Sequence, residues 1–133
     1  MIQRFVNRFV AAGDAVIPRK HPEDYTELVK WTIAAIAAEM DYITSEPDPN
    51  RVHVVDDGDY QGTMLFLIAA QGYQPSEYFY VTVAYGSCSG CDTLARIRNK
   101  YSSWETRDEV SDEQYKNYRT LALHIVQGIK ELP

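Results

Sequence analysis

One short segment of the chain, Tyr85 to Asp92, carries the side chains best suited to chemistry. It holds both cysteines in a CxxC motif, Cys88-Ser89-Gly90-Cys91, and Asp92 adds a carboxylate directly after them. Paired thiols at this spacing can exchange disulfides, bind zinc or act as nucleophiles, depending on their thiolate character. The motif therefore leaves several kinds of site open, and the flanking residues must discriminate among them.

Redox, zinc and structural interpretations of the CxxC motif differ in the residues they need. A redox pair of the thioredoxin type would lie in a parallel βαβ unit, and no such pattern is visible in this chain. A zinc site would take two of its four ligands from Cys88 and Cys91, but no second CxxC follows and the three histidines lack finger spacing. Two copies of the chain would complete a four-thiolate site across a homodimer. We favour small cysteines packed beneath a tight glycine turn, and we predict no cofactor beyond this zinc alternative.

The same segment has some features of an anion site. Glycines precede a predicted helix whose N-terminal N–H groups would point at a bound anion, and Arg96 follows on that helix. However, Cys91 to Arg96 is one residue short of a cysteine-phosphatase loop, and Asp92 would itself cap the helix N-terminus. Phosphate binding at this segment is therefore poorly supported.

A second candidate lies earlier, at Asp56-Asp57-Gly58-Asp59-Tyr60-Gln61-Gly62. Three carboxylates around a glycine resemble the ligands of a hard cation such as calcium. The late glutamate of an EF-hand is missing and strands flank the segment, so a solvated turn rich in aspartate is favoured. Tyr60 and Gln61 would then be contact residues on a recognition loop.

Periodicity predicts the elements that position these segments. Apolar residues at helical spacing and β-branched or aromatic runs give the order ααβββαα. We predict one α+β domain over residues 1–133, with a three-stranded antiparallel meander packed against helices. Two strands separate the aspartate segment from the cysteine segment, so both should lie at the same end of the sheet. The first predicted helix is about Ile2–Ala15, with Arg4 and Arg8 facing solvent, and the second begins near Pro22 and ends by the segment from Ser45 to Asn50.

The third predicted helix is Thr93–Tyr101, and the last starts at Ser111, where Ser111-Asp112-Glu113-Gln114 matches a capping box and an apolar stripe follows. The predicted strands are Arg51–Val55, Thr63–Ala69 and Tyr78–Tyr85.

Composition narrows the class of partner. The chain has 133 residues and a formal net charge of -6, which disfavours direct nucleic-acid binding and suits a basic protein partner. Its N-terminal residues alternate in a helical pattern unlike a signal peptide, and its longest apolar run is too short for a membrane span. These features predict a cytoplasmic protein with reduced cysteines.

The segments from Asp56 to Thr63, Tyr73 to Tyr78 and Tyr85 to Leu94 together resemble a group of small proteins encoded by bacteriophages and prophages. The resemblance covers Arg51 to Ile97, and its most specific part is the cysteine segment, YGSCSGCDTL. It implies a viral protein that acts in the host cytoplasm by binding a host component. The resemblance implies no particular enzymatic activity.

The sequence thus predicts an acidic phage-type protein that binds and inhibits a host or anti-phage defence component, for example a CRISPR nuclease. The alternative is a metal-dependent or thiol-dependent enzyme that uses the CxxC segment with nearby carboxylates. The predicted binding surface consists of Asp56, Asp57, Asp59, Tyr60, Gln61, Tyr85, Ser87, Ser89 and Asp92.

Overall fold

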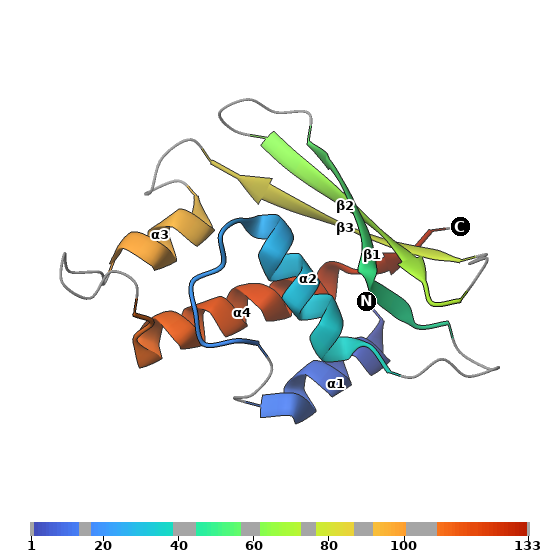
Figure 1. The fold of residues 1–133 in the computed structure, drawn as a ribbon, viewed down its shortest axis with the longest axis horizontal. Coiled ribbons are helices and arrows are strands. Elements are labelled where there is room, and N and C mark those ends of the chain that lie inside the picture. The colour runs from blue at the N-terminus through green and yellow to red at the C-terminus, as the bar shows by residue number, and fades with distance from the viewer. Residues whose placement is uncertain are drawn as a thin grey trace.

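The computed structural model describes residues 2–13, 17–38, 45–56, 62–72, 77–86, 92–100 and 109–132. These residues form an α+β arrangement in which the helices lie below a twisted sheet (Figure 1). No helix among them combines the length and the apolar character needed to cross a membrane. The elements in chain order are α1 (Gln3–Ala12), α2 (Tyr25–Ile36), β1 (Pro47–Asp56), β2 (Gly62–Ala70), β3 (Tyr78–Tyr85), α3 (Thr93–Lys100), α4 (Asp112–Gly128) and β4 (Lys130–Glu131).

The prediction of a three-stranded sheet and the order ααβββαα is wrong. The sheet has four antiparallel strands in the order β1-β2-β3-β4, because the chain continues after α4 and pairs with β3. Lys130 lies opposite Tyr80, and the N–H of Leu132 donates to the carbonyl of Tyr78 at 2.8 Å. A polar strand of two residues has no periodicity that the sequence could reveal. Its pairing with β3 depends on where α4 ends.

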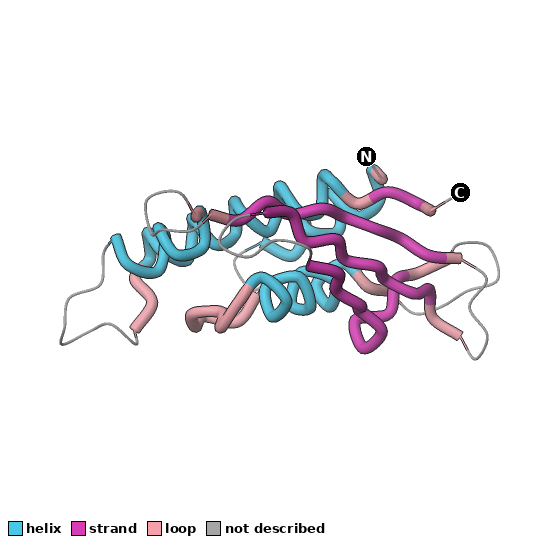
Figure 2. The backbone as a smooth tube through the Cα atoms, turned by 90° about the horizontal axis from the view of Figure 1, so that it is seen from above, coloured by secondary structure: helices cyan, strands magenta, loops and turns pink. Residues whose placement is uncertain are grey.

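One face of the sheet is buried and the other contacts solvent. In β3 the side chains of Phe79, Val81 and Val83 are buried, whereas the intervening Thr82 and Ala84 are exposed. This alternation is typical of an antiparallel sheet covered on one side only. The buried face packs on the helices, and the first and last described segments approach each other at the same side of the molecule in both Figure 1 and Figure 2.

Capping side chains set where the long helices begin. The predicted start of the second helix at Pro22 is wrong, because Asp24 is the N-cap and its carboxylate accepts the N–H of Glu27 at 2.8 Å. The capping box predicted at the start of the last helix is confirmed: the side chains of Ser111 and Gln114 each accept the backbone N–H of the other. Both helix starts are therefore set by capping side chains, and Pro22 does not mark the start of α2.

A buried ion pair joins α1 to the start of β1. Glu46 is 2% exposed, and its two oxygens accept from Arg8 Nη1 at 2.5 Å and Nη2 at 3.0 Å. Arg4 adds a hydrogen bond from Nη2 to the carbonyl of Ser45 at 2.8 Å. Arg4 and Arg8 therefore face a carboxylate inside the fold, whereas their helical spacing alone predicts an exposed side of α1.

Candidate functional site

The ends of β1, β2 and β3 that border the two candidate segments lie together. Gly62, where β2 begins, pairs with Tyr85, where β3 ends. The hydroxyl of Tyr85 donates to the carboxylate of Asp56, the last residue of β1, at 2.6 Å. The aspartate and cysteine segments therefore leave from the same end of the sheet (Figure 1).

Most of the predicted contact residues lie, in the sequence, in the segments that follow or precede these strand ends. Asp56 is exposed and Tyr85 is half-buried, so both are accessible at the base of the segments. The remaining predicted contacts other than Asp92, and both cysteines of the predicted zinc alternative, lie outside the described residues: Asp57, Asp59, Tyr60, Gln61, Ser87, Cys88, Ser89 and Cys91.

Asp92 connects the two ends of the cysteine segment. Its Oδ2 accepts the N–H of Gly86 at 3.0 Å, and its Oδ1 accepts the N–H of Ala95 at 3.0 Å, which caps α3. The hydroxyl of Tyr25 donates to the same Oδ1 at 3.0 Å. Asp92 is only 9% exposed and accepts from these three donors, so its carboxylate is engaged within the fold. Its predicted contact with a partner stays a prediction.

Tyr25 extends this contact to α2. Its hydroxyl oxygen accepts the N–H of Leu94 at 3.1 Å while its proton goes to Asp92. Burial raises the pKa of Tyr25 to about 12, so the phenol stays neutral and keeps donating at physiological pH. The start of α2 is thereby fixed beside the start of α3, at the same end of the molecule as the candidate segments.

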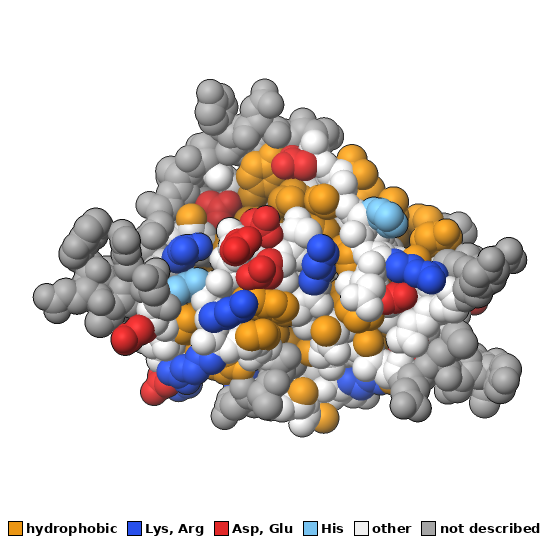
Figure 3. All heavy atoms as spheres, in the orientation of Figure 1, with side chains coloured by type: hydrophobic (Ala, Val, Ile, Leu, Met, Phe, Trp, Pro, Cys, Tyr) orange, Lys and Arg blue, Asp and Glu red, His pale blue; other side chains and the backbone are white. Residues whose placement is uncertain are grey.

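Acidic side chains gather over the start of α2, as the red side chains near the centre of Figure 3 show. Glu23 and Asp24 are exposed there, and Glu27 is half-exposed. The exposed Asp56 at the strand ends adds a further carboxylate to this end of the molecule. Carboxylates can form charge-assisted hydrogen bonds with cationic groups.

The described histidines do not form a metal centre. His21 sits between Tyr118 and the carbonyl of Glu109, 2.6 Å and 3.0 Å away, so Nε2 donates to the carbonyl and Nδ1 accepts from the phenol. His53 is exposed on the edge strand β1. In the part of the chain that the structure describes, no three His, Cys, Asp or Glu side chains come together as metal ligands.

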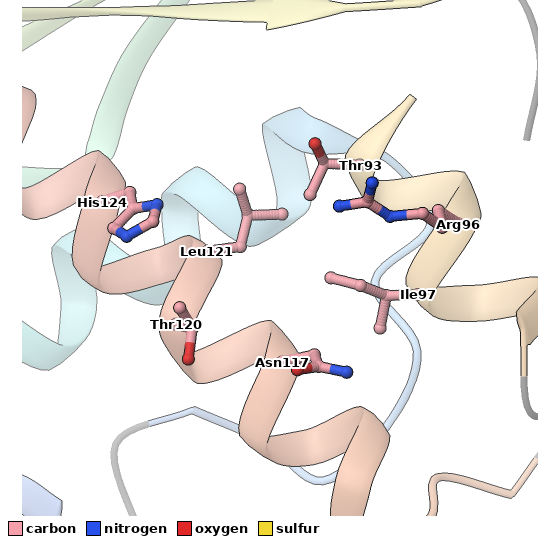
Figure 4. Close-up of a pocket in the computed structure, with 7 residues that line it drawn as sticks. All are labelled: Thr93, Arg96, Ile97, Asn117, Thr120, Leu121 and His124. Atoms are coloured by element: carbon pink, nitrogen blue, oxygen red, sulfur yellow. The ribbon is translucent and has the colours of Figure 1, made fainter. Parts of the chain in front are cut away.

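A groove between α3 and α4 is a feature that the sequence analysis missed. It has a volume of about 510 Å³, and polar side chains from both helices project into it (Figure 4). Its residues come from two helices that are separated in the sequence. No local sequence pattern shows that these two helices pack side by side. The groove is lined by Thr93, Arg96, Ile97, Asn117, Thr120, Leu121 and His124.

No model of a protein family, no curated protein sequence and no solved structure matches this chain. The similarity to phage proteins therefore stays a prediction carried by the quoted sequence segments.

Proposed function

We propose that this chain is a binding protein that engages a basic surface of another protein. The contact region, here named the sheet-end surface, comprises Asp56, Tyr85, residues 57–61 and 87–91, and the acidic start of α2. The observation that carries the proposal is the 2.6 Å hydrogen bond from Tyr85 to Asp56. The bond brings the last residue of β1 and the last residue of β3 together at one end of the sheet.

The base of the sheet-end surface is held by contacts on each side. The Gly62–Tyr85 pair fixes β2 to β3, and the N–H of Gly86 donates to Asp92, the residue that precedes α3. A surface whose anchoring residues are already ordered loses less conformational entropy on binding. Carboxylates at such a surface recognise arginine and lysine through charge-assisted hydrogen bonds.

More specifically, we propose a phage-encoded inhibitor that occupies a host or defence component, such as a CRISPR or other defence nuclease, in the host cytoplasm. Three features support this: the resemblance of the middle of the chain to phage proteins, the net charge of -6 and the exposed acidic side chains. A nuclease presents a basic surface to its nucleic acid, and an acidic protein can cover that surface without being a nucleic acid.

The test is affinity capture from a bacterial lysate, followed by measurement of the association rate with the captured protein. Asp56→Lys reverses the charge at the base of the surface, and we expect it to weaken binding about tenfold or more, because a repelled rim charge slows association. Glu131→Lys makes the same charge change on β4, where Glu131 pairs with the start of β3 at the opposite end of the sheet. This control should bind like the unchanged protein.

Equal capture by Asp56→Lys and by the unchanged protein would remove the sheet-end surface from the proposal. Metal analysis and thiol titration of the purified protein separate the enzyme hypothesis from this one. Stoichiometric zinc or an unusually reactive thiol would favour the enzyme, because both require thiolate chemistry that a binding surface does not.

A further inference from the structure

We propose that the groove between α3 and α4 binds a small phosphate monoester, a compound with one phosphate on a small apolar body. The groove is separate from the sheet-end surface and independent of the protein partner. Its volume of about 510 Å³ lies within the range of small-molecule sites. The proposal depends on which lining side chains already form hydrogen bonds within the protein and on the charge of the lining.

Three polar side chains of the groove are uncommitted among the described residues. There the side chains of Arg96, Asn117 and His124 form no hydrogen bond or ion pair, although the backbone N–H of Arg96 donates to the carbonyl of Asp92. Other polar side chains of the same two helices are used internally: Asp92 caps α3, and Gln114 donates to the carbonyls of Ile97 and Arg98. The donors of Arg96, Asn117 and His124 are therefore available to a ligand.

The charge of the groove is opposite to that of the chain. Among the described residues, its lining includes the guanidinium of Arg96 and no carboxylate, although the protein has a net charge of -6. In Figure 4, Arg96 extends from α3 toward α4, above Asn117 and on the same side as Thr93. A guanidinium offers parallel N–H groups that match two oxygens of a phosphate, and the amide and hydroxyl groups can satisfy the third oxygen.

The floor of the groove is apolar, which favours an organic phosphate over the free ion. Ile97, which is 5% exposed, and the half-buried Leu121 lie between the polar residues. The walls are held in place because Gln114 of α4 donates to the carbonyls of Ile97 and Arg98 at 3.1 and 3.2 Å. A ligand can therefore bury an apolar group against Ile97 and Leu121 while its phosphate meets Arg96.

The experiment is an NMR titration of the full chain with phenyl phosphate, benzoate and phenol. We expect saturable shifts of the Thr93, Arg96, Asn117 and His124 amides with phenyl phosphate, weaker binding of benzoate and none of phenol. Arg96→Gln should weaken the binding of phenyl phosphate about tenfold or more, since a charge-assisted bidentate contact is lost. Arg96→Lys keeps the positive charge but loses the paired N–H groups of the guanidinium, so it should weaken the binding of phenyl phosphate by an intermediate amount.

Arg98→Gln is the matched control, because it removes the same charge from the same helix outside the groove lining. It should change the affinity less than about twofold, since the Debye length in physiological salt confines charge effects to near neighbours. The proposal is overturned if phenyl phosphate gives no saturable shifts, if benzoate or phenol binds as tightly, or if Arg98→Gln weakens binding as much as Arg96→Gln. Arg96 is exposed, so its variants should fold, and their circular dichroism spectra check this.

Discussion

The carboxylate of Asp92 links the end of β3 to the start of α3, because it accepts the N–H of Gly86 and the N–H of Ala95. The sequence indicated the second of these contacts, since aspartate before a helix is a common N-cap. It gave no indication of Tyr25, which lies on another helix and donates to Asp92 across the fold. A residue predicted to contact a partner is thus occupied by contacts that only the tertiary structure brings together.

Replacing Asp92 by alanine should destabilise the protein by about 2–3 kcal/mol. The change removes the cap of α3 and leaves the N–H of Gly86 and the hydroxyl of Tyr25 without their acceptor. Urea unfolding followed by circular dichroism measures the loss. The exposed Asp112, which pairs with Arg19 at the surface, is the control, and Asp112→Ala should leave the stability nearly unchanged. A similar small effect of both variants would contradict the structural role of Asp92.

Buried tyrosines make the protein sensitive to alkaline pH. Burial raises the pKa of Tyr25 and of Tyr118 from the ordinary 10.0 to about 12. The folded state therefore retains these protons more tightly than the unfolded state, so stability is complete below about pH 10 and falls as the pH rises toward about 12. Unfolding experiments across this range should show the fall, and Tyr25→Phe should reduce its slope. Stability that stays constant up to about pH 12 would contradict the burial of both phenols.

At the scale of elements, the sequence predicts those features that depend on residues close together in the chain. The cap of α4 depends on residues three apart, Ser111 and Gln114, and was found from the sequence. The register of the first three strands could not be read in the same way, because it depends on pairs such as Gly62 and Tyr85. β4 escaped prediction because two polar residues become a strand only where Ile129 anchors the end of α4 in the core.

The ion pair between α1 and β1 is expected to be a strong link between elements. Glu46→Ala should cost about 3 kcal/mol, because it leaves Arg8 without its bidentate partner. This estimate is at the lower end for buried pairs, since 32% of the Arg8 side chain is exposed and water can solvate part of its charge. Asp48→Ala, which breaks a more exposed pair with Arg51, should cost less than about 1 kcal/mol in the same unfolding assay.

A double variant separates the contribution of the pair from the cost of an unpaired charge. Arg8→Met with Glu46→Met should be more stable than either single replacement, because no buried charge is left unpaired. Additive losses in the double variant would show that the two side chains act independently. That result would contradict a direct ion pair.

At the scale of the whole molecule, α4 connects the core to the groove. One side of α4 buries Tyr118, Ala122 and Val126 in the core, and another forms the groove with α3. Sequence periodicity predicted the buried side, which repeats every three to four residues. The groove depends on the angle at which α3 lies on α4, and so Arg96 and His124 could not be paired from the sequence.

Ile129 is the residue through which the end of α4 should stabilise the whole fold. It is fully buried, so Ile129→Ala should cost about 3 kcal/mol through lost burial and the cavity left behind. Leu132→Ala is the control, because Leu132 is 47% exposed and should cost less than about 1 kcal/mol. Thermal unfolding compares the two variants. Equal shifts of the melting temperature would mean that the end of α4 does not anchor the core.

β3 receives segments from both ends of the described chain. The ring of Phe5 in α1 meets the ring of Phe79 edge to face, with 5.4 Å between centroids, and Glu131 of β4 pairs with Phe79 through the backbone. Opening β3 therefore requires α1 and β4 to separate from it together. In native-state hydrogen exchange, the amides in the middle of β3 should be released only by global unfolding, at the same free energy as the denaturant transition. The two ends of the chain would then belong to one cooperative unit, although they are the parts most often expected to fray.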